Sequence, residues 1–152
     1  MLQAGQKAPE FALKDSKGEV RELQEFYGSP TVIYFYPKDD TPGCTTEACS
    51  FRDNYNQFEQ QGIQVVGISY DSPESHAEFK EKYNLPFTLL SDSDKTVAEK
   101  YGADRGLLNF VGAKRISYLL DKNGTIIKIY PNVTPADHAG DILEDFKKHS
   151  SE

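Results

Sequence analysis

The sequence predicts an α/β protein in which helices flank a central mixed sheet. Apolar runs rich in β-branched and aromatic residues, typical of buried strands, occupy residues 31–36 and 63–70. A segment with apolar residues at helical spacing follows each run. Near the C-terminus, segments 115–121 and 125–130 are predicted to be two more strands, and the Asn-Gly pair between them is a hairpin signal.

Local signals place the elements along the chain. In order, strands are expected at residues 11–13, 19–21, 31–36, 63–70, 87–90, 115–121 and 125–130. Helices are expected to start at Thr41-Pro42, Ser72-Pro73, Asp92-Ser93-Asp94 and Thr134-Pro135, which supply capping side chains or first-turn prolines. Gly28 is expected to end a helical turn that begins near Leu23, and Gly62 to end the first long helix. The buried helix faces are expected to carry Phe51, Tyr55 and Phe58, then Ala77, Phe79 and Tyr83, and finally Ile142, Leu143 and Phe146.

Three segments allow more than one interpretation. The run Asp92-Ser93-Asp94 has the residue types of a calcium loop but lacks its ligand pattern, so helix capping is the better interpretation. The loop 102–113 carries four large apolar side chains from Leu107 to Val111, which form a pocket wall, a docking surface or part of the core. His76 falls inside a predicted helix, where an exposed or satisfied histidine is more common than a catalytic base.

Composition and charge limit the class of protein. The 152 residues are expected to form a single domain spanning 1–152, because no linker, repeat or low-complexity run divides them. The net charge of −7 argues against nucleic acid and anionic membrane surfaces as partners. No signal peptide is found, and no apolar run approaches the roughly 18–20 residues of a membrane span, so a cytoplasmic protein is expected. Two cysteines at short spacing also fit a reducing compartment.

The chemistry is expected at Cys44 and Cys49, which lie where strand 31–36 is followed by a helix. In an open α/β sheet, active sites collect beyond the carboxyl ends of the strands. With Thr41 as N-cap, Cys44 falls in the first helical turn, among unpaired N–H groups and the positive end of the helix dipole. Both favour the thiolate, so Cys44 is expected to be the more reactive sulfur. Cys49 lies more than a turn further on and is expected to behave as an ordinary thiol.

The spacing of the cysteines predicts a conformational change. Five residues along an α-helix give about 7.5 Å of rise and about 140° of rotation, which separates the two Cα atoms by roughly 8.6 Å. Because a disulfide tolerates at most about 7 Å, Cys44 and Cys49 can pair only after the helix partly unwinds. The segment is therefore interpreted as a two-state redox element. From the cysteines alone, two small buried hydrophobes are an equally good interpretation, and the spacing does not match that of zinc ligands.

The motif around Cys44 resembles that of a known family. The run Pro37-Lys38-Asp39-Asp40-Thr41-Pro42-Gly43-Cys44 resembles the P-x-x-x-T-x-x-C active-site motif of the peroxiredoxins. The continuation Thr45-Thr46-Glu47-Ala48-Cys49 resembles the Q-type, or bacterioferritin comigratory protein, subfamily, in which a resolving cysteine lies five residues on. The resemblance covers essentially the whole chain, including segments 5–11, 85–92 and 115–121. It implies a thioredoxin-like fold with N-terminal additions.

The resemblance implies a role for each motif residue. Cys44 would be the peroxidatic cysteine, whose thiolate attacks a hydroperoxide and becomes a sulfenic acid. Cys49 would be the resolving cysteine, which condenses with that sulfenic acid to an intramolecular disulfide. Thr41 would hydrogen-bond the peroxide oxygens, Pro37 would shield the site from water, and Arg115 would face the thiolate from a neighbouring strand. The peroxide would bind against Thr41, Gly43, Cys44 and Arg115. From the sequence alone Arg115 is more often an exposed charge at a strand edge.

The resemblance also implies the substrates and partners. The substrates would be hydrogen peroxide and alkyl hydroperoxides, and the reductant a thioredoxin- or glutaredoxin-type dithiol. No metal or organic cofactor would be required, and a monomer would suffice because both cysteines lie in one helix. Two other functions remain open. A disulfide reductase would favour a C-x-x-C pair, which the sequence lacks. A redox-regulated sensor or holdase would use oxidation of Cys44 to unwind the helix and expose Phe51, Tyr55 and Phe58.

Overall fold

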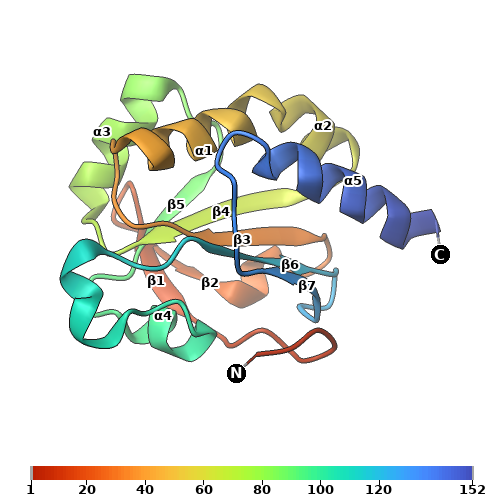
Figure 1. The fold of residues 1–152 in the computed structure, drawn as a ribbon, viewed down its shortest axis with the longest axis horizontal. Helices are drawn as coiled ribbons and strands as arrows, with labels where there is room; N and C mark the ends of the chain where they lie inside the picture. The colour runs from red at the N-terminus through yellow and green to blue at the C-terminus, as the bar shows by residue number, and fades with distance from the viewer. Residues whose placement is uncertain (1, 152) are drawn as a thin grey trace.

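A seven-stranded mixed sheet runs through the centre of the molecule, with helices on both faces (Figure 1). The structure is a computed structural model that describes residues 2–151. The strands are β1 (Ala12–Asp15), β2 (Val20–Glu22), β3 (Thr31–Phe35), β4 (Gln64–Ser69), β5 (Thr88–Ser91), β6 (Ile116–Leu120) and β7 (Ile126–Tyr130), in the spatial order β2-β1-β5-β4-β3-β6-β7. Strands β3, β4 and β5 are parallel and the other pairings are antiparallel, which confirms the predicted mixed sheet.

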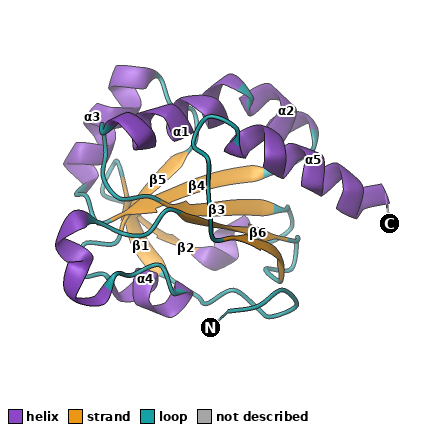
Figure 2. Cartoon of the chain, in the orientation of Figure 1, coloured by secondary structure: helices purple, strands orange, loops and turns teal. Residues whose placement is uncertain are grey.

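Helices cover both faces of this sheet, as Figure 2 shows by colour. They are α1 (Pro42–Asp53), α2 (Tyr55–Gln60), α3 (Pro73–Tyr83), α4 (Thr96–Tyr101) and α5 (His138–Ser151), with the 3-10 helices η1 (Leu23–Phe26) and η2 (Gly106–Val111). Helices α1, α2, α3 and α5 lie on one face, and α4 lies on the other (Figure 1). Strand β3 is buried along its whole length because its side chains alternate between two apolar clusters. None of the helices within residues 2–151 is long and apolar enough to cross a membrane.

Two predicted helices differ from the observed ones. The helix expected to run to Gly62 breaks at Asn54, whose side-chain amide donates to the carbonyl of Ser50 at 2.8 Å and competes with the helical pattern. On α3 the expected buried residue Ala77 is exposed, and His76 is buried instead. The other predicted face residues, including Phe51 and Phe58, are buried or partly buried as expected.

Capping was predicted correctly at two helix starts. The hydroxyl of Ser72 accepts a hydrogen bond from the N–H of Ser75 at the start of α3. The carboxylate of Asp92 accepts from the N–H groups of Val97 and Ala98, which confirms the capping interpretation of this acidic run.

The register of the central strands brings distant residues together. Phe35 at the end of β3 pairs with Ile68 of β4 on one side and with Ile116 of β6 on the other. Arg115, which precedes β6, therefore lies beyond the carboxyl end of β3, where the chain turns into α1. Asp71, which follows β4, lies beyond the carboxyl end of that neighbouring parallel strand. A site beyond these strand ends is thus a consequence of strand pairing.

Candidate active site

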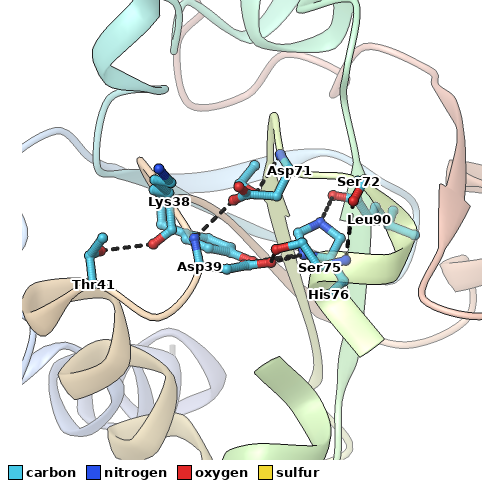
Figure 3. A network of polar contacts seen from close by, with 10 residues as sticks. Lys38, Asp39, Thr41, Asp71, Ser72, Ser75, His76 and Leu90 are labelled. Atoms are coloured by element: carbon cyan, nitrogen blue, oxygen red, sulfur yellow. Dashed lines mark hydrogen bonds and ion pairs between the residues drawn. The ribbon is translucent and has the colours of Figure 1, made fainter. Parts of the chain in front are cut away.

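The start of α1 differs in one respect from the prediction. Thr41 is the N-cap residue and Pro42 holds the first position, as expected, but the Thr41 side chain does not cap the helix. Its hydroxyl donates instead to the carbonyl of Lys38 at 2.8 Å (Figure 3). The first-turn N–H groups, including that of Cys44, are therefore left without this cap. Because its proton is committed to Lys38, the Thr41 hydroxyl can offer a ligand only an acceptor.

An arginine lies directly against the sulfur of Cys44. The side chain of Cys44 is buried in the first turn of α1, and Nη2 of Arg115 lies 3.4 Å from its Sγ atom. Nη1 of the same guanidinium donates to Oε1 of Glu47 at 2.7 Å. Arg115 thus bridges two side chains that are one turn apart on α1. Burial opposes the charge on Arg115, but Cys44 and Glu47 outweigh it and raise the pKa of the guanidinium. The guanidinium thus places a fixed positive charge beside the Cys44 sulfur.

Glu47 is a site residue that the sequence analysis missed. It is fully buried, and its Oε2 atom has no hydrogen-bond partner within the described part of the chain. Burial raises the pKa of Glu47 to about 7, while the neighbouring Arg115 opposes this rise. Its position three residues after Cys44 puts both side chains on one helix face, and this spacing was the available signal.

Cys49 lies on α1 in a different environment from Cys44. It is partly exposed and lines a shallow pocket with Thr45, Ser50 and Ala136 on the outer side of the helix. Burial raises the pKa of the Cys49 thiol, with Arg52 opposing. Neither cysteine is in a disulfide, and α1 runs unbroken through both. Within residues 2–151, no three His, Cys, Asp or Glu side chains gather as metal ligands would.

Two glycines allow the backbone to approach the site closely. A Cβ atom on Gly43 would lie 2.9 Å from Nη2 of Arg115, so a larger residue would displace the guanidinium. Gly112 has φ +98°, and a Cβ there would lie 2.2 Å from the carbonyl oxygen of Pro37. Pro37 is partly buried, and its backbone is packed against Gly112 beside the site.

The apolar loop before β6 is exposed and lies beside the turn that precedes α1. Leu107 is 99% exposed and Phe110 is 81% exposed, so the core-packing interpretation of this loop was wrong. Phe110 and Val111 line a surface pocket together with Pro37 and Lys38. The loop is therefore positioned as a pocket wall next to the turn that leads into α1.

Comparison with known proteins identifies the class. Residues 4–129 match the AhpC/TSA family. The chain is 43% identical over 153 residues to the peroxiredoxin Bcp of Bacillus subtilis, covering 98% of each protein. It therefore belongs to the AhpC/TSA family, and its sheet and helices form the thioredoxin-like peroxiredoxin fold.

Solved structures support a narrower placement. Peroxidoxin BcpB of Mycobacterium tuberculosis is 33% identical, with a TM-score of 0.91 and coverage of 97% of this chain and 98% of that one. A bacterioferritin comigratory protein of Xanthomonas campestris, described in terms of its alkyl peroxide reduction activity, is 31% identical, with a TM-score of 0.88 and coverage of 97% and 99%. Within the family the chain is a peroxiredoxin of the Bcp/PrxQ subfamily, a thiol peroxidase that reduces peroxides.

Proposed function

We propose that Cys44 is the peroxidatic nucleophile. The observation that carries this proposal is the Arg115 guanidinium 3.4 Å from the Cys44 sulfur, at the start of a helix whose first turn is not capped by Thr41. The thiolate attacks one peroxide oxygen, an S–O bond forms and the O–O bond breaks. The departing oxygen takes a proton and leaves as water or an alcohol, and Cys44 becomes a sulfenic acid.

The neighbouring groups fit the charge that develops in this step. Arg115 and the N–H of Cys44 are fixed donors for the departing oxygen. The Thr41 hydroxyl, whose proton is engaged by Lys38, accepts a hydrogen bond from the O–H of the bound peroxide. Gly43 leaves room for the guanidinium. The family resemblance assigns Pro37 the role of shielding the site from water.

Cys49 is proposed to resolve the sulfenic acid. Its thiol attacks the Cys44 sulfur, a disulfide forms and water leaves. Because α1 is intact through both cysteines, this step requires part of the helix to unwind. The location of Cys49 at a surface pocket on the outer side of α1 supports access by a dithiol reductant of the thioredoxin or glutaredoxin type.

The substrates, assembly and compartment are also proposals. The named activity of the Xanthomonas campestris relative supports alkyl hydroperoxides as substrates beside hydrogen peroxide. A monomer is supported by the presence of both cysteines on one helix, since no second chain is needed to complete the pair. A transient, catalytic disulfide supports a reducing compartment such as the cytoplasm.

Mass spectrometry after one equivalent of hydrogen peroxide tests this mechanism. The reduced protein should lose two hydrogens within seconds, and the change should map to a disulfide between Cys44 and Cys49. The Cys49→Ser variant should instead gain one oxygen on Cys44 and should not be recycled by thioredoxin. Unreacted thiols in the wild-type protein, or multiple turnovers by Cys44→Ser, would refute the assignment.

A further inference from the structure

The turn 37–41, which joins β3 to α1, is held by a buried polar network. Asp39 in this turn is 8% exposed, and its carboxylate accepts three hydrogen bonds (Figure 3). The donors are the hydroxyl of Tyr36 at 2.6 Å, the hydroxyl of Ser75 at 2.8 Å and Nδ1 of His76 at 2.7 Å. The chemical steps described above use none of these groups.

Polar partners hold both ring nitrogens of His76. The side chain has no exposed surface, and Nε2 lies 2.9 Å from the carbonyl oxygen of Leu90 in β5. A carbonyl oxygen only accepts, so Nε2 carries a proton. Nδ1 lies 2.7 Å from the carboxylate of Asp39, which two hydroxyl groups also contact, so both ring nitrogens of His76 are held by polar partners.

Asp40, the next residue of the turn, is tied to the C-terminal end of α3, the helix that carries His76. Asp40 has φ +55°, and its carboxylate accepts from Nζ of Lys82 at 2.7 Å and from the hydroxyl of Tyr83 at 2.8 Å. These two hydrogen bonds lower the pKa of Asp40. The main chain is held as well, because the N–H of Asp39 donates to the Asp71 carboxylate at 2.8 Å. Helix α3 therefore fixes the turn at two points, and Asp71, two residues beyond the end of β4, fixes it at a third.

We propose that His76 is a positioning residue for the Cys44 site, an inference that rests on the role proposed for Cys44. It acts through Asp39: by holding the turn, it fixes the start of α1 and with it Thr41 and the sulfur of Cys44. A histidine that only filled space would not need both ring nitrogens engaged, one by the Asp39 carboxylate and the other by the Leu90 carbonyl.

Helix α3 also limits the segment of α1 that unwinds. Nη1 of Arg52, in the last turn of α1, donates to the carbonyl of Tyr83 at 2.7 Å. Helix α3 therefore holds the chain on both sides of the two cysteines, through Asp40 before them and Arg52 after them. The active site can unwind between these points and then reform in the same place.

The test is the His76→Gln substitution in a Cys49→Ser background, where oxidation of Cys44 is observed alone. The second-order rate constant with hydrogen peroxide, measured by stopped flow, should fall at least tenfold. The matched control is Ser72→Ala, which removes the cap of α3 but leaves the contacts of Asp39 in place. Its rate constant should stay within twofold of the parent.

A second variant and two further readouts keep the test decisive if His76→Gln folds poorly. Asp39→Asn should slow the reaction in the same way, and the double variant should be no slower than either single one, because both act through one contact. Histidine ¹H–¹⁵N spectra of the parent should show a proton on Nε2 of His76, donated to the Leu90 carbonyl. Amide exchange at Asp39 should speed up in either variant.

The outcomes separate the two proposals. A parent that does not react with peroxide refutes the role of Cys44, and the exchange of the Asp39 amide still decides whether His76 holds the turn. A reactive parent that is matched by both His76→Gln and Asp39→Asn overturns the positioning role. The absence of a proton on Nε2 of His76, or unchanged exchange in the variants, overturns the clamp.

Discussion

The Glu47→Gln substitution is expected to stabilise the protein above neutral pH. Burial raises the pKa of Glu47 from 4.5 to about 7, although Arg115 opposes the rise. At about 1.36 kcal/mol per pH unit, the difference between 7 and 4.5 corresponds to about 3.4 kcal/mol. The pKa of Glu47 is higher in the folded state than in the unfolded state, so its carboxyl does not destabilise the fold below pH 4.5. As the pH rises from 4.5 to about 7, ionisation of Glu47 lowers the free energy of unfolding by about 3.4 kcal/mol.

His138 has the opposite effect over nearly the same pH range. It is buried, with Nε2 2.7 Å from the hydroxyl of Ser117, and burial together with Arg115 lowers its pKa from 6.5 to about 4. The stability associated with neutral His138 is present above pH 6.5. It is lost as the pH falls to about 4, again by about 3.4 kcal/mol. In the wild-type protein the contributions of Glu47 and His138 largely cancel, so only variants reveal either one.

Urea unfolding of the reduced protein between pH 4 and pH 8 measures both effects. The unfolding free energy of Glu47→Gln minus that of the wild type should increase by about 3 kcal/mol as the pH rises from 4.5 to 8. The difference for the control His138→Gln should increase as the pH falls. Altered packing adds only a constant offset to either curve. A difference for Glu47→Gln that does not change with pH would refute the ionisation of a buried carboxyl at this position.

Two further substitutions test the geometry of the site. Arg115→Lys should slow oxidation of Cys44 by about 10²-fold in stopped-flow measurements. The reason is that one ammonium cannot replace the guanidinium that contacts both Cys44 and Glu47. An unchanged rate would show that these two contacts do not contribute to the reaction. Gly112→Ala should lower the unfolding free energy by about 1–3 kcal/mol, since it combines positive φ with a clash against Pro37. The control Gly140→Ala, in α5 with open space around it, should be neutral or stabilising, and equal losses in both would contradict the role of the close approach.

Local sequence patterns were sufficient for most of the fold. Strands β3, β4 and β6 are largely apolar runs, and the Asn-Gly pair before β7 marks the hairpin that places β6 and β7 at one edge of the sheet. The helix start at Thr41-Pro42 placed Cys44 in the first turn and Cys49 further along, which the structure shows. These features depend on neighbours in sequence, so the sequence contains their cause.

Local sequence patterns could not predict the contacts between distant segments. Asp39 and His76 are 37 residues apart, and their pairing depends on how α3 packs beside the turn. The helix break at Asn54 depends on a side chain that competes with the backbone, and asparagine occurs in many unbroken helices. Glu47 was the exception, because its spacing from Cys44 placed it on the same helix face and a search for partners of the thiol would have found it.

Three departures from local rules occur near the start of α1. Thr41 stands at the N-cap without capping, Asp40 adopts a left-handed backbone, and Glu47 is buried with one oxygen unpaired within the described residues. A missing cap alone costs a helix about 0.5–2 kcal/mol. The uncapped first turn leaves N–H groups available to a peroxide, and it also lowers the free energy needed for the proposed unwinding of α1. If Cys44 and Cys49 form the proposed disulfide, the same weak helix start favours both steps, provided that α3 holds the turn before it.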